Sequence, residues 1–505
     1  MRLGARSWRL AASLIAVAFV GVALRRDLGY SPVSGVDVGT VVGERLLESL
    51  ALAAAAAAIG MALFAMRPRC RQGSGAAPAP SAVPAALWVL PLFGAVGVAW
   101  EFGGIPTVGP HSAIVARFAA TLLPAAALGV AFAVWTAVAR RTSRDVLVAL
   151  LVGTLVTDAV FGLPALGTLI VTAATRPDRL MVRGALFAVA AIAVVAEVTF
   201  VPAARALDEL HGGRSNLRRA ANGVVAAIWV VALVAATLGR SAFGVGRAAR
   251  AGTRIATGVS ATHPFGTDVL GRDVLVRVLA TARGSLLLVV AATLVALVLG
   301  AAIGAVVAFA RGRTERVGLA ALAGWAAFPG EIVAVAFLTL NGRRGSQAAL
   351  ALAFVAAPSI AAGAQRRVAD AVRRSDARLS SGAWLRDVGA RAVPGLFPAA
   401  LATMFAGASR VVIAELVAGL LGAGPAATQT WSHEVVMQLP FASHAPFAVL
   451  APVSVAFVTA VALAGLGNAI RPTRNGGSAA RETENPLRKD VLVDLRGAPR
   501  DRERA

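Results

Sequence analysis

The sequence predicts an all-α, polytopic membrane protein of about twelve transmembrane helices arranged as two six-helix halves. Of its 505 residues, 57% are hydrophobic and only 15% are charged, a composition far more apolar than that of soluble domains. Apolar runs long enough to span a bilayer recur along the chain, and a short motif occurs once in each half. These observations make a lipid bilayer the expected solvent of the fold.

The first predicted half, residues 1–210, holds six apolar runs. Each has about the 20 residues, mainly apolar, that a spanning helix needs. The N-terminus is basic and the run after it could be a signal peptide, but no small-x-small cleavage site precedes Arg25, so we expect an uncleaved first span. The runs lie near residues 8–24, 46–66, 86–102, 113–139, 146–172 and 180–204.

The second predicted half, residues 211–470, follows a charged connector at 205–220 and holds six further runs. Ala- and Gly-rich faces on these helices are expected to let neighbouring helices approach closely. Residues 471–505 are rich in charge, Gly and Pro, and we expect a disordered cytoplasmic tail there. The runs lie near residues 220–238, 285–310, 317–340, 347–364, 395–421 and 446–470.

The distribution of charge predicts the orientation of the spans. The chain has 49 basic and 26 acidic residues, a net charge of +23. In a soluble protein this excess would suggest a nucleic-acid partner, but here the Arg clusters fall between apolar runs, as the positive-inside rule expects of cytoplasmic loops. We therefore expect membrane lipid and no nucleic acid as partner, and a plasma-membrane protein with both termini in the cytoplasm. The clusters lie at residues 67–71, 140–144, 311–316 and 366–391.

A ten-residue motif occurs in the fifth predicted span of each half. The sequences DAVFGLPALG (158–167) and ELVAGLLGAG (415–424) share an acid at the first place, Gly-Leu at the fifth and sixth, and Gly at the tenth. Equivalent positions in both halves indicate a duplicated six-helix unit. An acid within a span is costly and often functional, so Asp158 and Glu415 are candidate gate or pathway residues. The alternative is a partly wetted cap or an interhelix hydrogen bond.

A polar stretch precedes the eighth predicted span. Residues 263–285 read HPFGTDVLGRDVLVRVLATARGS, and such a charged, Gly-rich segment is tolerated only outside the hydrocarbon or where protein or water satisfies its backbone. We expect an outer-face loop in which the charged residues pair locally and cap the following helix. The motif consists of His263, Pro264, Gly266, Thr267, Asp268, Gly271, Arg272 and Asp273.

This stretch resembles the segment between the first and second spans in one of the paired permeases of dipeptide, oligopeptide and nickel ABC importers. The similarity continues through FPGEIVAVAFL (328–338) and VIAELVAGLLGAG (412–424) and covers most of residues 214–470. The first half is similar to the other permease of the pair, through LLPAAALGV (122–130) and VTDAVFGLPALGTLIVTAATRPD (156–178). The chain thus resembles both permeases fused in one polypeptide.

The resemblance implies transport without covalent chemistry by this chain. The halves would enclose a path for peptides or similar small solutes, an extracytoplasmic solute-binding protein would deliver the solute, and separate ABC ATPase subunits would drive alternation between outward- and inward-facing states. The polar stretch would then either brace its own loop or contact the solute-binding protein.

The resemblance also implies a coupling segment between the fourth and fifth spans of each half, where a short helix opening Glu-Ala-Ala and carrying a later Gly docks into the ATPase. In the second half, aligning the family's ending on Pro394 and Pro398 leaves an eroded motif, in which only the second Ala agrees. In the first half, RRTSRD (140–145) leaves no room for the helix. The aligned positions are Ser375, Asp376, Ala377, Ser381, with Gly382 one place late, and Arg391.

Other site chemistry is not predicted. A P-loop needs a Gly-Lys-Ser/Thr element, but the sole lysine, Lys489, precedes Asp490, so ATP is expected on partner subunits and no cofactor on this chain. SHEVV (432–436) begins like a zinc-protease helix, but Met437 stands where the second His is required, so no metal site is expected.

Two other classes compete with the importer. Some secondary transporters share a six-plus-six layout, but a secondary transporter should hold ionisable residues near mid-membrane for ion coupling. The acids found, Asp158, Glu197 and Glu415, lie toward the ends of predicted spans. A decayed permease or membrane scaffold without active transport is favoured by the missing first-half coupling segment.

Overall fold

The computed structural model describes residues 29–65, 124–130, 143–176, 178–185, 187–189, 216–238, 252, 255–327, 330–342, 344–375, 381–424 and 429–470. Within these ranges the chain is mostly helical, and β pairing is limited to two isolated bridges, Tyr30 with Asp37 and Thr267 with Asp273. A helix satisfies its backbone groups internally, which is the condition for crossing a bilayer. The all-α prediction is confirmed for this part of the chain.

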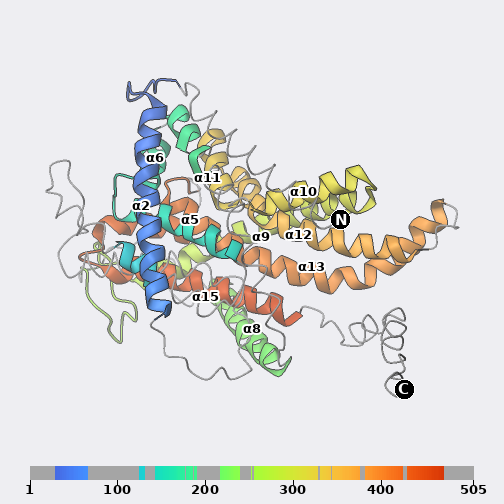
Figure 1. Ribbon diagram of the computed structural model, residues 1–505. Coiled ribbons are helices and arrows are strands. Elements are labelled where there is room, and N and C mark those ends of the chain that lie inside the picture. Colours follow the sequence, from blue (N-terminus) through green and yellow to red (C-terminus); the bar gives the residue numbers. More distant parts are fainter. Residues whose placement is uncertain are drawn as a thin grey trace, which may run out of the picture. The chain divides into compact units, whose positions relative to one another are not determined.

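The helices are numbered in chain order (Figure 1). The first are α2 (Val38–Ala65), α5 (Ser143–Val160), α6 (Leu166–Thr175) and α8 (Asn216–Leu238). The others are α9 (Val274–Phe309), α10 (Arg313–Ala327), α11 (Gly330–Asn341), α12 (Gly345–Arg374), α13 (Ser381–Leu420), α14 (Trp431–Gln438), the short 3-10 helix η3 (Leu439–Phe441) and α15 (Pro446–Ile470).

Four of the described helices are long and apolar enough to cross a membrane: α9, α12, the part of α13 from Phe397 to Leu420, and α15. A fifth candidate is the pair α10 and α11, bent by 79° between Ala326 and Gly330. This number suits a multi-pass membrane protein, whereas twelve spans in two halves stay a prediction. The predicted spans at 8–24 and 86–102, Glu197 and the tail 471–505 lie outside the described residues.

The two faces of α9 differ in exposure as a lipid-facing helix requires. Ser285, Leu288, Ala292 and Ala296 are buried against the other helices. The opposite stripe consists of large apolar side chains that are exposed, and lipid is the solvent in which such a stripe is stable. Its members are Leu287, Val290, Leu294 and Val298.

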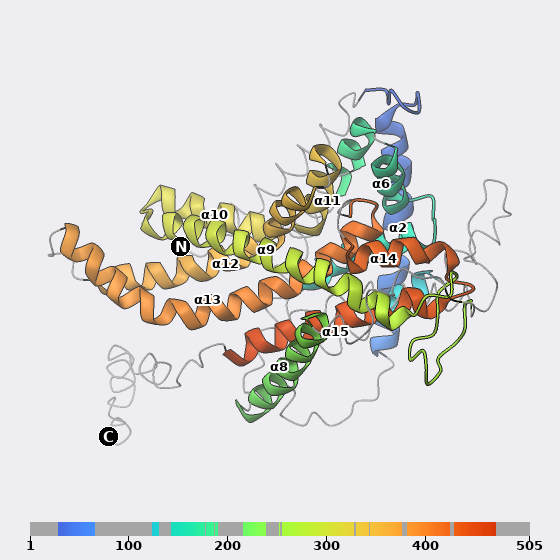
Figure 2. The same cartoon turned by 180° about the vertical axis from the view of Figure 1, so that it is seen from behind.

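Small residues set the packing around α12. This helix packs against α9, α11 and α13, α13 packs against α15, and α15 against α8; Figures 1 and 2 show α12 beside α13 from opposite sides. A Cβ added to Gly300 of α9 would lie 2.8 Å from the carbonyl oxygen of Ala357, and one added to Gly467 of α15 would lie 2.7 Å from that of Ala402. The expected close approach of helices through small residues is therefore observed.

Candidate functional site

The segment from His263 to Asp273 forms a compact turn that starts α9. Gly266 and Gly271 have φ angles of 73° and 72°, a region that favours glycine. Asp273 caps α9, because its carboxylate accepts a hydrogen bond from the backbone N–H of Val276 at 3.1 Å. The second carboxylate oxygen of Asp273 lies 2.7 Å from His263 Nδ1. Residues of this motif thus hydrogen-bond to one another and cap α9.

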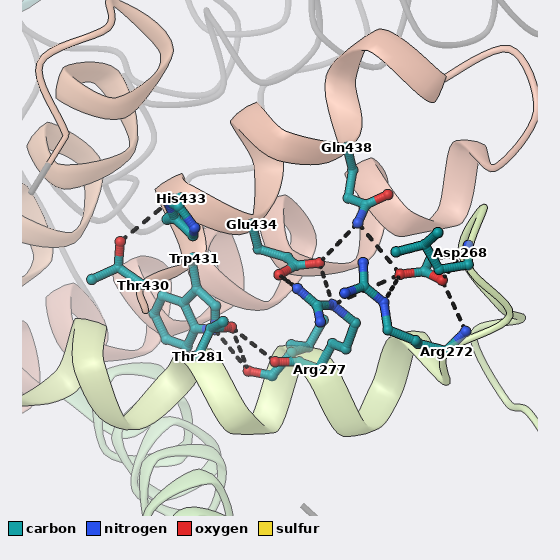
Figure 3. Close-up of polar contacts among 11 residues, drawn as sticks. Asp268, Arg272, Arg277, Thr281, Thr430, Trp431, His433, Glu434 and Gln438 are labelled. Atoms are coloured by element: carbon teal, nitrogen blue, oxygen red, sulfur yellow. Dashed lines mark hydrogen bonds and ion pairs between the residues drawn. The ribbon is translucent and has the colours of Figure 1, made fainter. Parts of the chain in front are cut away.

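Five polar side chains, Asp268, Arg272, Arg277, Glu434 and Gln438, form what we call the polar network (Figure 3). Asp268 is fully buried, and it accepts hydrogen bonds from Arg272 Nε at 2.6 Å and from two backbone N–H groups. Arg277 of α9 donates Nε to Glu434 of α14 at 2.6 Å and pairs a second time through Nη2. Gln438 Nε2 donates to Glu434 and Asp268 at 3.3 and 3.4 Å.

The polar network ties the turn, α9 and α14 together, and it is balanced in charge. Its two carboxylates, Asp268 and Glu434, are matched by the two guanidinium groups of Arg272 and Arg277. Buried charges are stable only when paired and hydrogen-bonded in this way. The local pairing expected from the sequence is observed, and these contacts are those of a brace; contact with a solute-binding protein stays a prediction.

Ser285, Glu415 and the N-terminal turn of α14 form what we call the second anchor. Glu415 is fully buried in α13, and its carboxylate accepts from the backbone N–H and hydroxyl of Ser432, at 3.2 and 2.5 Å, and from the hydroxyl of Ser285 at 3.3 Å. Ser285 Oγ accepts from the backbone N–H of Trp431, the first residue of α14, at 2.9 Å. Serine and acid thereby satisfy N–H groups that a buried helix start would leave without partners.

Ser49, Asp158 and the N-terminal turn of α6 form the first anchor, with the same connections. Asp158 is fully buried in α5, and its Oδ2 accepts from Ser49 Oγ of α2 at 2.6 Å and from the backbone N–H of Gly167 at 3.5 Å. Ser49 Oγ accepts from the backbone N–H of Leu166, the first residue of α6, at 3.0 Å. The other oxygen, Asp158 Oδ1, is buried with no hydrogen-bond partner among the described residues.

The anchors also share a register within α2 and α9. Asp37, which precedes α2, accepts from the backbone N–H of Thr40 at 2.7 Å, as Asp273 does from that of Val276. Ser49 and Ser285 each lie twelve residues after that aspartate. Hydrogen bonds from the hydroxyl and then the backbone N–H of Thr40 lower the pKa of Asp37 below its ordinary value. Buried residues at matching positions are Val38 and Val274, Val42 and Val278, Leu52 and Leu288, and Ala56 and Ala292.

The glycines of the repeated motif have different roles in its two copies. Gly162 ends α5 with a φ of 63°, four residues after Asp158, whereas Gly422, with a φ of 73°, ends α13 seven residues after Glu415. Gly419, which the sequence aligns with Gly162, lies inside α13, where an added Cβ would overlap Ser432 of α14. The acids therefore correspond between the copies, and the helix continues nearly one turn further in the second.

The segment aligned with the family's coupling helix lies where α12 meets α13. Ser375 ends α12, and its hydroxyl donates to Asp387 of α13 at 2.7 Å. α13 begins at Ser381 with Gly382 exposed in its first turn, and it runs as one helix into the candidate span. Trp384 packs edge-on against Phe309 of α9, with ring centroids 6.1 Å apart. Outside the described residues lie Asp376, Ala377 and the side chains of Ser381 and Arg391.

Sequence reasoning overlooked two charged residues within predicted spans. Arg410 lies near the middle of the candidate span Phe397–Leu420, and Glu331 lies in the first turn of α11, immediately after the bend. The two charges interact electrostatically across α11 and α13, which pack together. Arg410 and Glu331 thus add two ionisable groups to the three acids that the sequence analysis found within predicted spans. Each residue is a single charge within a long apolar run. Such a charge is visible in the sequence, but an average of hydropathy over the run hides it.

Neither the known protein-family models nor the curated proteins contain a match to the chain. Within the described ranges, His, Cys, Asp and Glu side chains form no group of three or more that could hold a metal ion. His433 and His444, at and after α14, have no such neighbours among these residues. The site geometry thus defines a helical protein with several candidate membrane spans, two acid–serine anchors and one polar network.

Proposed function

We propose that the chain is the transmembrane permease component of an ABC importer of the plasma membrane. It would form the path for peptides or similar small solutes, with ATP hydrolysed by separate subunits, the solute delivered by an extracytoplasmic binding protein, and both termini in the cytoplasm. The observation that carries the proposal is the pair of anchors, which repeat one arrangement in one register in two stretches of the chain. Two homologous six-helix halves, 1–210 and 211–470, account for such repetition.

The end of the α12–α13 hairpin supports coupling to an ATPase subunit. Residues 381–396 of α13 precede the candidate span, so this part of the helix extends beyond the apolar segment. The hairpin end carries Arg366, Arg373 and Arg386, all exposed, and under the positive-inside rule it faces the cytoplasm. The Ser375–Asp387 hydrogen bond and the Trp384–Phe309 contact join this end to α9 and α12, as transmission of a displacement requires.

In the first half, the sequence predicts no room for a coupling helix in the loop 140–145. Among the described residues, α5 begins at Ser143, inside that loop. ATPase subunits would therefore act on the second half alone.

Co-purification with ATPase subunits tests the proposal. The chain is expressed with the ATPase subunits of its own organism, and ATP hydrolysis is measured in nanodiscs for wild type and for a variant with 375–382 replaced by a Gly/Ser linker. We expect co-purification, with hydrolysis reduced at least about tenfold in the variant, since the rigid connection is lost. The matched control replaces 342–344, the connection at the opposite end of α12, and should keep full activity. Absence of any ATPase partner would reject the importer.

A secondary transporter is the second candidate, favoured by the mid-span charges Glu331 and Arg410. It predicts solute uptake into proteoliposomes that depends on an ion gradient and needs no nucleotide. A membrane scaffold or decayed permease predicts uptake under neither condition.

A further inference from the structure

Glu331 and Arg410 are charged groups whose position in the fold requires a partner. Arg410 lies ten residues from the end of the candidate span Phe397–Leu420 and thirteen from its start. An ionised side chain at that depth is costly, and such residues are retained where they bind or conduct something. Neither the polar network nor the anchors use either residue.

The two groups share one region of the helix packing. Gly330, at the start of α11, packs so closely on α12 that an added Cβ would lie 2.9 Å from Val355 Cα. Gly407 of α13 packs against the next residue of α12, Ala356, at 3.0 Å by the same measure. Glu331 follows Gly330 by one residue and Arg410 follows Gly407 by one helical turn, so acid and base flank the same level of α12.

Neither charge has an ion-pair partner among the described residues. Glu331 and Arg410 nevertheless interact electrostatically, and the Glu331 carboxylate accepts a hydrogen bond from its own backbone N–H. Both side chains are partly buried. Ser409 Oγ, one residue before Arg410, is buried and without a partner among the described residues. The hydroxyl of Ser409 therefore has hydrogen-bonding capacity that no described residue uses.

The bend between α10 and α11 places this level at a break in a candidate membrane span. Broken helices in transporters mark solute sites, because the chain ends at the break present polar groups within the bilayer. Here the break of 79° is followed at once by an acid in the first turn of α11, and a base lies on the neighbouring helix α13.

We propose that Glu331 and Arg410 form a binding site for zwitterionic solutes, with the carboxylate receiving an ammonium group and the guanidinium receiving a carboxylate. A solute with a single charge would leave either Glu331 or Arg410 without a counter-charge. A zwitterion such as a short unblocked peptide pairs with both. The site deepens the proposed function, on which it rests in taking α11 and α13 to border the solute path.

Equilibrium binding to the full chain in nanodiscs, without ATPase subunits, tests the site. The probes are radiolabelled dialanine, its N-acetyl derivative and its C-terminal amide, which carry both charges, only the negative and only the positive charge. We expect wild type to prefer dialanine at least about tenfold over either blocked form, the range typical of hydrogen bonds to charged groups. Equal affinity for the three probes, or no binding, would overturn the inference.

Variants test which residue binds which charge of the solute. Arg410→Gln should bind dialanine and its amide equally, and Glu331→Gln should bind dialanine and its N-acetyl form equally. The double exchange Glu331→Arg with Arg410→Glu should regain the preference for the zwitterion, since both signs are again present. Arg316→Gln, at an exposed position of α10, is the control and should behave as wild type. A uniform loss for all probes would indicate a structural role and reject the site.

Failure of this site and failure of the proposed function give different results. Charge-independent binding alongside a productive ATPase partnership rejects only the zwitterion site. Charge-dependent binding without any ATPase partner rejects only the importer.

Discussion

The two anchors connect an acid, a serine and a helix start in the same way, but their acids receive different numbers of hydrogen bonds. Glu415 receives three hydrogen bonds from Ser285 and Ser432, distributed over both carboxylate oxygens. Asp158 receives two, both on Oδ2, and leaves Oδ1 without a partner among the described residues. The second residue of the capped helix explains part of this difference, because Ser432 adds a hydroxyl that Gly167 lacks.

A serine could not replace Gly167 without moving the backbone. A Cβ at this position would overlap the carbonyl of Leu155 in α5 and lie 2.8 Å from Asp158 Cβ. In the second anchor the roles are reversed, because Gly419 of α13 leaves room for the Ser432 side chain. Close helix contact in the first anchor thus excludes the donor that completes the second.

The largest expected effect comes from replacing Arg277, a residue of the polar network. Arg277 lies four residues after the capping Asp273, and the equivalent position after Asp37 is Val41. Arg277→Val should destabilise the protein by about 3–5 kcal/mol, because Glu434 stays buried without its cation. Thermal unfolding in nanodiscs measures the loss, and adding Glu434→Gln should recover part of it. As a control, Arg373→Val breaks an exposed pair with Asp370 and should cost no more than about 1 kcal/mol.

The anchors themselves should differ in the same assay. Glu415→Ala leaves three buried donors without an acceptor, so we expect a loss of about 3 kcal/mol. Asp158→Ala strands two donors but also removes a buried oxygen that has no partner, so the expected net loss is only about 1 kcal/mol. Equal losses, or a larger one for Asp158→Ala, would show that the number of hydrogen bonds does not separate the anchors.

The smallest effect concerns the exposed cap of α2. The pKa of Asp37 is lowered in the folded protein, so its contribution to stability is present above its ordinary pKa and is lost as the pH falls through the folded value. Asp37→Asn should therefore melt at a slightly lower temperature than wild type near neutral pH. The difference should shrink below about pH 4, the ordinary pKa of an aspartate, and vanish only once the pH is below the lowered pKa of the folded protein. A difference that persists in acid would contradict the capping role of the carboxylate.

Composition and periodicity predicted the helical class and the approximate positions of α9, α12 and α15, because length and apolar content decide whether a segment suits a bilayer. The repeated motif located the acids Asp158 and Glu415. It did not give their serine partners, which lie 109 and 130 residues away. Only the matching twelve-residue spacing from Asp37 and Asp273 could have indicated them.

The remaining differences between the predicted and the observed structure arise where local features or tertiary contacts matter more than the mean hydropathy of a segment. The run 317–340 looks continuous by hydropathy, yet the structure bends it by 79° between Ala326 and Gly330. Arg277 and Glu434 are separated by 157 residues, and their pairing depends on how α9 and α14 pack. Tertiary packing, which a sequence pattern does not encode directly, decides such contacts.

Each anchor also forms between residues that are synthesised far apart in time. Ser49 precedes Asp158 by 109 residues and Leu166 by 117. At typical synthesis rates, its partners are therefore made roughly 5–20 s after Ser49. Every residue of the first anchor precedes α9 in the chain. The first anchor can therefore form before the ribosome has made any part of the second.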